Sequence, residues 1–408
     1  MATIITSLDI GSSQVKGVVA TPKKDGTLSV ITAFKQPSQG FKRGVLTDVE
    51  DAGQCLRSIT QDLERISKNA TKNVFLNFSS EQVWSRMSRG IVAVARADQE
   101  IQQDDVDRVV QASRAIKLAN NKLVLHNVVR EFFVDDVGDI ADPLGMTGNR
   151  LEVSTLIVEA FAPHVNILLK NAERAGLTVG GVIFNPLASA HVSLSKRQKD
   201  LGVLLIDFGF GTTTIAVYEE GKVLHTRCIP IGMGYVTNDI AIGFTTSIAI
   251  AEKLKTGYGY AIARTIPKKE AINLSDLDPS AHGEISKRFL CEIIEARLEQ
   301  IIDVVSKDLA TLGRTVQLPG GVVITGGGVK LPGLTEYIRE KLRLPTQVGF
   351  PDLTPFEITT PTYHDLLDDP EFSSALGLLL WGVSQEKKEV WGSEFSDKVK
   401  SFMKNLIP

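Results

Sequence analysis

Two stretches of the chain share one pattern of hydrophobic and polar positions. They are SLDIGSSQVKGVVA near the start and LLIDFGFGTTTIAVY in the middle. Each predicts an apolar strand that ends in Asp, a short turn of glycine and hydroxyl residues, and a second strand rich in β-branched residues. Asp9 and Asp207 hold the same place in the pattern and lie 198 positions apart (207 minus 9). This repetition predicts two related half-molecules.

The last stretch of the chain has a helical pattern instead. Large apolar residues recur there at spacings of 4, 4, 3 and 4, at Trp391, Phe395, Val399, Phe402 and Leu406. On a helix of about 3.6 residues per turn these positions share one face. Lys398 lies beside this face, and Met403 lies within the same stretch. Such a helix either packs on the core of its own protein or lies on another surface.

Composition and charge narrow the classes of protein that fit. The 408 residues, 43% hydrophobic and 23% charged, are typical of a globular protein of two to four domains. A net charge of -3 gives no reason to expect nucleic acid as a partner. The three cysteines have no paired spacing, so neither a disulfide framework nor a structural zinc site is expected. This pattern fits a protein of the reducing cytoplasm. No apolar run reaches the roughly 18 residues of a membrane span, so any membrane role is expected to be peripheral.

The two repeated turns have the composition of phosphate-binding loops. Glycine lets backbone N–H groups approach phosphate oxygens, and Ser or Thr hydroxyls add donors. The predicted phosphate ligands are Gly11, Ser12, Ser13, Gly209, Gly211, Thr212 and Thr213. Asp9 and Asp207 are placed to hold Mg²⁺ through water, since this ion dehydrates reluctantly. One such turn alone would indicate only an ordinary hairpin, whereas two of the same design indicate a phosphate chain held from both sides.

A third glycine cluster and a charged pair complete the predicted site. Gly326, Gly327 and Gly328 follow a strand and precede a helical pattern, where a bare backbone can lie against a nucleotide base. Glu252 and Lys255 stand three apart on one helix face, which alone would also fit a surface ion pair. The chain has no G-x-x-x-x-G-K-[ST] and no G-x-G-x-x-G motif, so it is not a Walker A or dinucleotide-fold protein.

In this order, the four motifs resemble the superfamily of actin, Hsp70 and sugar kinases. The resemblance implies an α/β fold whose two domains close on ATP and Mg²⁺, with Glu252 and Lys255 at the ribose and base. Closer similarity is to the bacterial FtsA family of actin-like cell-division proteins and covers essentially the whole chain. It is carried by DIADPLGMTGNRLEV (139–153), by the run that begins NPLASAHVSLSKRQKDLGVLLIDFGFG at residue 185, and by DDPEFSSALGLLLWG (368–382).

The FtsA resemblance implies a division into subdomains. An inserted SHS2-like subdomain 1C replaces the 1B subdomain of actin. The implied ranges are 1–80 and 163–195 for 1A, 81–162 for 1C, 196–258 and 320–382 for 2A, 259–319 for 2B, and 383–408 for a short linker with an amphipathic membrane-targeting helix. The implied partners are the C-terminal tail of FtsZ at 2B, later division proteins at 1C, and further copies of the chain in a filament beneath the inner membrane.

The same resemblance explains the apolar stripe as a membrane anchor. Partial burial of its five apolar side chains, with about 1 kcal/mol for each lysine near anionic lipid, gives marginal binding for one helix. A filament with many such helices gains avidity.

Asn185 departs from the FtsA pattern, in which Glu usually precedes Pro-Leu-Ala-Ser. An amide orients water but does not accept its proton. With Asp207 it forms the predicted catalytic pair, and we expect slow ATP turnover at most. Phe210 also departs, because relatives often have glycine there. Lys16 matches the phosphate lysine of actin, and a solvated lysine on a strand would also fit this position.

Two alternatives share the predicted fold. A PilM-like pilus-assembly ATPase homologue has a similar insertion, and DIGSSQVK resembles its first phosphate loop. PilM-like proteins generally lack a lipid-binding tail, which favours FtsA. A small-molecule kinase of the superfamily would need a carboxylate base in the cleft and has no use for the tail.

Overall fold

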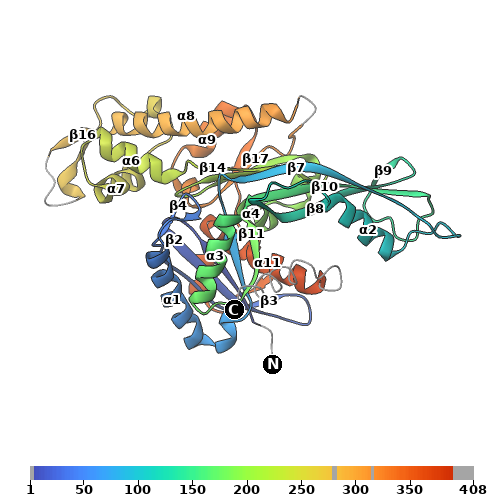
Figure 1. The fold of residues 1–408 in the computed structure, drawn as a ribbon. Helices are drawn as coiled ribbons and strands as arrows, with labels where there is room; N and C mark the ends of the chain where they lie inside the picture. The colour runs from blue at the N-terminus through green and yellow to red at the C-terminus, as the bar shows by residue number, and fades with distance from the viewer. Residues whose placement is uncertain (1–3, 278–282, 314–316, 389–408) are drawn as a thin grey trace.

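Two mixed sheets of the same design form the centre of the molecule (Figure 1). The computed structural model describes residues 4–277, 283–313 and 317–388. The first sheet has the order β11-β6-β1-β2-β3-β19, with β1 (Ile5–Ile10), β2 (Gln14–Pro22), β3 (Leu28–Pro37), β6 (Val74–Phe78), β11 (Val179–Phe184) and β19 (Phe356–Glu357). The second has the order β14-β13-β12-β17-β18, with β12 (Val203–Phe208), β13 (Thr213–Glu219), β14 (Lys222–Ile229), β17 (Val322–Thr325) and β18 (Thr346–Val348).

The two sheets repeat the same strand directions around their central strands. β1 is antiparallel to β2 and parallel to β6, and β12 is likewise antiparallel to β13 and parallel to β17. In each hairpin the Asp faces a residue seven positions later, Lys16 opposite Asp9 and Thr214 opposite Asp207. The sequence repeat therefore corresponds to a repeat in the fold.

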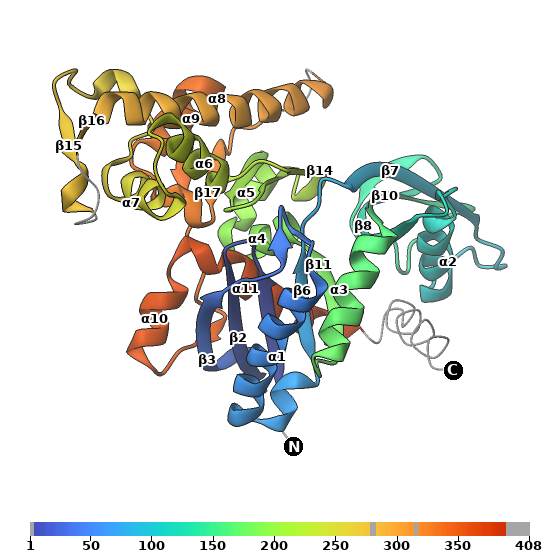
Figure 2. The same ribbon diagram turned by 60° about the vertical axis from the view of Figure 1, so that its left-hand side comes forward.

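Helices cover both faces of the first sheet (Figure 2). They are α1 (Val49–Ile66) and α3 (Ala162–Arg174) on one face, with α4 (Asn185–Ser193) and α11 (Ser373–Lys388) on the other. Side chains of β1 alternate between the two faces, so Leu8 packs towards α1 and Ile5 towards α11. Asp9, one residue before the end of β1, therefore lies on the α4 and α11 side.

Helix α4 lies between the two sheets. Its Ala188 and Val192 join the core of the first sheet, whereas Ala190 and the C-cap residue Leu194 pack on β12, β13 and β17 of the second. All four are small or branched apolar residues, and the helix is buried almost all round. This placement brings the start of α4 close to the ends of both central strands.

The outer face of the second sheet carries a second helical layer. It comprises α6 (Met233–Gly243), α7 (Ile248–Tyr258), α8 (Lys287–Thr311) and α9 (Leu334–Leu342). A two-stranded ribbon of β15 (Ala271–Asn273) and β16 (Glu284–Ser286) lies at its edge (Figure 1). The remaining short elements are β4 (Phe41–Lys42), β5 (Val45–Leu46), α5 (Lys196–Leu201) and α10 (Pro361–Leu367).

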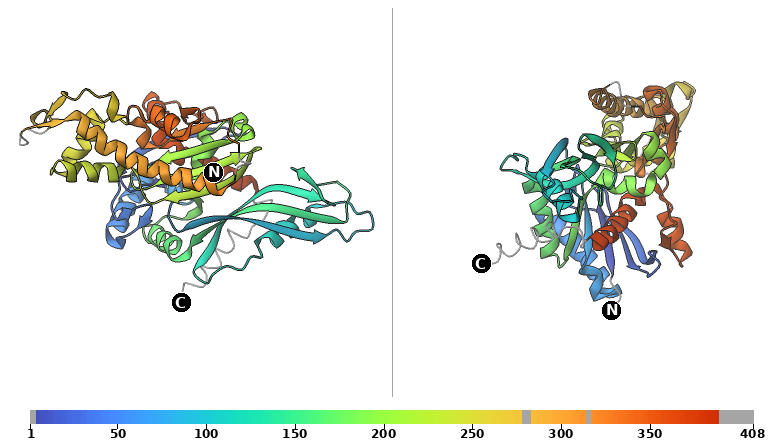
Figure 3. Two further views of the ribbon diagram at one scale, coloured as in Figure 1. Left: turned by 90° about the horizontal axis from the view of Figure 1, so that it is seen from above. Right: turned by 90° about the vertical axis from the view of Figure 1, so that its right-hand side faces the viewer.

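An antiparallel unit projects from the body as an arm (Figure 3, left). Its sheet has the order β7-β10-β8-β9, from β7 (Val83–Ala93), β8 (Lys122–Val134), β9 (Val137–Ile140) and β10 (Arg150–Phe161), and α2 (Gln103–Arg114) covers one face. Val109, Phe132 and Val153 belong to its separate small core. At its base the Ser85 hydroxyl donates to the Thr226 carbonyl of β14 over 3.0 Å.

The predicted amphipathic stretch 391–408 lies outside the described residues. Within the part of the chain that the structure describes, no helix combines the length and apolar character needed to cross a bilayer.

Candidate functional site

A cleft of about 450 Å³ opens between the two halves of the molecule. Both repeated turns, the glycine cluster and α7 contribute to its walls. The predicted residues that line it are Asp9, Gly11, Ser12, Ser13, Lys16, Asn185, Asp207, Gly209, Gly211, Thr212, Glu252, Lys255, Gly326, Gly327 and Gly328. Thr213 is buried beneath the cleft, where its hydroxyl donates to the Ile231 carbonyl over 2.8 Å.

The two turns have the same backbone geometry and touch each other. Gly11 N–H donates to the Gln14 carbonyl over 3.0 Å, and Gly209 N–H donates to the Thr212 carbonyl over 2.9 Å. A Cβ on Gly211 would lie only 2.4 Å from the Ser12 hydroxyl oxygen, so only glycine permits this approach. The tips of the turns therefore face each other across the floor of the cleft.

Asp9 is held between a cation and an amide. Lys16 Nζ lies 2.8 Å from one carboxylate oxygen, and Asn77 Nδ2 donates to the other over 2.6 Å. Lys16 also donates to the Glu371 carbonyl over 2.9 Å. Burial opposes the charge of Lys16, but Asp9, Asp207 and Glu371 outweigh it and raise the pKa of the ammonium group. The cleft thus contains a lysine that stays charged.

Among the described residues, the hydrogen-bond partners of Asp207 are all neutral groups. Its Oδ2 accepts from Ser189 over 2.8 Å, from Asn185 over 3.0 Å and from Ser374 over 3.3 Å. Burial, reinforced by Asp9, raises the pKa of Asp207, although the Ser189 hydrogen bond opposes this shift. A buried carboxylate whose hydrogen bonds come from neutral groups favours a bound cation.

Asn77, Ser189 and Ser374 are site residues that the sequence reasoning missed. Asn77 stands at the end of the buried strand β6, which runs parallel to β1, and polar residues at such strand ends do meet at one sheet edge. That rule would have found Asn77. Ser189 and Ser374 come from α4 and α11, which meet only in the folded chain, so no local pattern indicates them.

The predicted ribose and base residues form an ion pair that also lines the cleft. Lys255 Nζ lies 2.7 Å from Glu252 Oε2 and donates to the Thr237 hydroxyl over 2.9 Å. Lys255 is buried, while the Glu252 side chain keeps 40% of its surface exposed. Both residues line the cleft, and Glu252 is the more exposed of the two.

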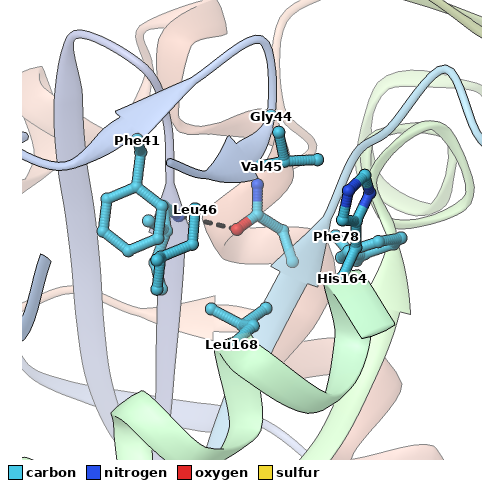
Figure 4. Close-up of a pocket in the computed structure, with 9 residues that line it drawn as sticks. Phe41, Gly44, Val45, Leu46, Phe78, His164 and Leu168 are labelled. Carbon is cyan, nitrogen blue, oxygen red and sulfur yellow. Dashed lines mark hydrogen bonds between the residues drawn. The ribbon is translucent and has the colours of Figure 1, made fainter. Parts of the chain in front are cut away.

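A much smaller cavity lies beside the cleft, between the β4 and β5 ribbon and α3 (Figure 4). It measures about 10 Å³ and is bordered by Phe41, Leu46, Phe78 and Leu168, with His164 at its rim. This volume is at the lower limit for one water molecule, and the lining is mostly apolar. The cavity is a packing gap.

Comparison with known protein families gives two matches. Residues 204–377 match the model of the cell division protein FtsA, and residues 81–159 match the SHS2 domain inserted in FtsA. The cell division protein FtsA of Pseudomonas aeruginosa is 32% identical over 397 residues, which cover 96% of this chain and 93% of the relative. That of Bacillus subtilis is also 32% identical, over 92% of this chain and 82% of the relative.

The chain belongs to the FtsA family of cell division proteins. Solved structures support the same fold. The chain resembles the PilM-PilN type IV pilus biogenesis complex with a TM-score of 0.66 at 19% identity, over 93% of this chain and 98% of the other. It resembles MreB5 of Spiroplasma citri bound to ADP with a TM-score of 0.57 at 14% identity, over 95% and 99%.

The family assignment decides between the FtsA reading and the PilM-like reading of the sequence. The fold is the actin-like α/β fold with an inserted SHS2 unit, as predicted. The similarity to PilM is a similarity of fold, whereas FtsA relatives match in sequence along nearly the whole chain. The protein is therefore an actin-like cell division protein, and the PilM-like alternative is not favoured.

Proposed function

We propose that this FtsA-family protein binds Mg·ATP in the cleft, polymerises on the cytoplasmic face of the cell membrane, and tethers the FtsZ ring to it. One observation carries the nucleotide part of the proposal: two turns of identical hydrogen bonding face each other across a cleft of about 450 Å³, each beside a buried Asp. The actin-like neighbour MreB5 was solved with ADP, which supports a nucleotide as the ligand.

The residues around the turns fit magnesium bound to a nucleotide. Among the described residues no group of three or more His, Cys, Asp or Glu forms a metal site by itself. Two carboxylates, Asp9 and Asp207, would therefore hold Mg²⁺ through its waters, with phosphate oxygens as the remaining ligands. The ion would supply positive charge at the phosphates, and Asn185 would orient water at the same place.

Protein partners would use surfaces away from the cleft. Subdomain 2B, predicted as 259–319, is proposed to bind the FtsZ tail, and the exposed Phe289 on α8 supports an apolar contact there. Subdomain 1C, predicted as 81–162, is proposed to bind other division proteins, and Met87 and Ile91 are exposed on its strand β7. The subdomain boundaries themselves are part of this proposal.

The membrane part of the proposal rests on the apolar stripe from Trp391 to Leu406, in the stretch outside the described residues. Phe402 belongs to the stripe, and Ser393 falls on the opposite face of a helix of 3.6 residues per turn. Phe402→Asp and Ser393→Asp therefore introduce the same charge on the two faces.

The test is co-sedimentation with anionic liposomes, with and without Mg·ATP. We expect the full chain and Ser393→Asp to pellet with lipid, more strongly with Mg·ATP, and to form filaments visible by electron microscopy. Phe402→Asp and a chain that stops before Trp391 should stay in the supernatant. Equal behaviour of all four proteins would contradict the proposed anchor.

A further inference from the structure

Phe210 is an unusual residue in the second turn. It occupies the position that Ser12 holds in the first turn, 198 residues earlier. Phe210 lines the cleft and is 39% exposed, and it stands between two glycines, Gly209 and Gly211. A large apolar ring at the tip of a turn that faces a polar cleft requires an explanation.

The ring is held in one place by the start of α6. Gly234 N–H donates to the Phe210 carbonyl over 2.7 Å. A Cβ on Gly234 would lie 2.7, 2.9 and 3.0 Å from three carbon atoms of the ring, closer than any real side chain tolerates. Because Gly234 has no side chain, the ring can lie against the start of this helix.

The ring of Phe210 lies between the second turn and α7. Its backbone belongs to the turn, and its ring centroid lies 5.7 Å from the ammonium group of Lys255 on α7. Met233, Glu252 and Gly328 line the cleft on that side. The ring therefore lies between the second turn and the ion pair of Lys255 with Glu252.

We propose that Phe210 forms the apolar wall of the sugar subsite, and that Gly234 is the residue that allows it to do so. This inference rests on the proposed binding of a nucleotide in the cleft. A nucleotide with its phosphates at the turns and its base at Gly328 places its pentose at this ring. The ring has no donor or acceptor, so it contacts the C–H groups of the sugar, and recognition of the hydroxyl groups falls to Glu252.

The first test separates the sugar subsite from the phosphate site. Binding of Mg·ATP and of Mg-tripolyphosphate, which has no sugar, is measured by titration calorimetry for the parent and Phe210→Ala. We expect the substitution to weaken ATP binding by about 10-fold, the loss of one apolar contact, and to leave tripolyphosphate binding unchanged. Equal weakening of both ligands would mean that Phe210 only shapes the turn, and would overturn the inference.

The second test uses the contact between Phe210 and Gly234. Gly234→Ala should displace the ring into the cleft and weaken ATP binding more than Phe210→Ala does. Phe210→Ala combined with Gly234→Ala should therefore bind better than Gly234→Ala alone. Gly257→Ala is the matched control, because Gly257 lies on the neighbouring α7 with no atom within 4 Å of an added Cβ.

The outcomes distinguish this inference from the proposed function. If Gly234→Ala binds ATP like the parent, or the double variant binds no better than Gly234→Ala, the Phe210 inference fails while nucleotide binding stands. If the parent chain itself binds no Mg·ATP, the proposed function fails and the inference fails with it.

Discussion

Asp9 and Asp207 hold equivalent positions in the two hairpins, yet their surroundings differ. Asp9 forms an ion pair with Lys16, whereas the hydrogen bonds to Asp207 within the described residues come from the neutral groups of Ser189, Asn185 and Ser374. Removing a carboxylate from water without a cation is costly, which is why burial raises the pKa of Asp207. Of the two, Asp207 would therefore gain more from the proposed Mg²⁺.

Asn185 leads to a prediction about turnover. Its amide is already engaged, since Nδ2 donates to Asp207 and Oδ1 accepts from Asn77 over 3.3 Å. We expect Asn185→Glu to hydrolyse Mg·ATP faster than the parent, by about 10-fold or more, because a carboxylate can accept the proton of the attacking water. The rate of phosphate release at saturating Mg·ATP measures hydrolysis by the parent and the variant.

Asn185→Gln is the control for this prediction, because it has the length of Glu but keeps the amide. It should hydrolyse ATP no faster than the parent. If Glu and Gln raise the rate equally, or if neither changes it, proton acceptance at this position does not limit turnover.

His126 leads to a prediction about pH. Burial lowers its pKa to about 3, and its Nε2 accepts a hydrogen bond of 2.9 Å from the Phe184 N–H. The unfolded chain takes up this proton near pH 6.5, so the stability of the folded protein is full above that pH and falls as the pH decreases towards 3. At pH 5.5 the loss is about 1 kcal/mol relative to pH 7.5.

Denaturant unfolding at these two pH values checks the effect of His126. His126→Gln retains an acceptor for the Phe184 N–H but no titrating group, so its loss of stability between pH 7.5 and 5.5 should be smaller by about 1 kcal/mol. An identical loss in parent and variant would show that another group carries the pH dependence.

Among the elements, α11 connects distant parts of the molecule. Near its start Ser374 donates to Asp207, and further along Trp381 lies against the His126 ring of β8, with ring centroids 5.3 Å apart. The helix runs along α4 between these two contacts. The cleft and the inserted unit are thereby joined by one continuous helix.

Close contact between α11 and α4 depends on Gly377. A Cβ at this position would lie 1.9 Å from the Ala188 carbonyl oxygen, so the two helices would have to separate. We expect Gly377→Ala to lower the free energy of unfolding by about 1–3 kcal/mol, the usual cost of overpacking a core. Chemical denaturation measures this change.

The matched control is again a glycine inside a helix. Gly257→Ala adds the same methyl group to α7 in open space, and we expect a small gain of about 0.5–1 kcal/mol from helix propensity. If both substitutions stabilised the protein, the contact of α11 with α4 would not be as close as the structure has it.

At the scale of the whole molecule, the cleft is built from both halves of the chain. Asp9 and Lys16 come from the first sheet, and Asp207 with Glu252 from the second half. A ligand that contacts residues of both halves binds to the folded chain and not to the unfolded chain. Its binding free energy therefore adds to the free energy of unfolding of the protein.

We expect Mg·ATP at about 100 times its dissociation constant to raise the free energy of unfolding by about 2.7 kcal/mol. Thermal unfolding with and without the ligand measures this. Asp207→Ala removes a residue of the site and should lose most of the shift. A shift of the same size in this variant would place the nucleotide elsewhere.

The sequence by itself determined the strand and turn motifs and their order. The repeat of Asp9 and Asp207 is local, because strand alternation and glycine turns depend on neighbouring residues, and the matching sheets followed from it. The family resemblance supplied the insertion, whose own sheet and core then appeared in the structure.

Only the tertiary structure decided which side chains surround those motifs. Ser189, Ser374 and Asn77 meet Asp207 or Asp9 because α4, α11 and β6 converge there, and their separations along the chain are too large for any periodic pattern. The burial that raises the pKa of Asp207 is likewise a property of the packed sheets. Local spacing specifies elements, whereas long-range packing specifies the electrostatic environment in which those elements act.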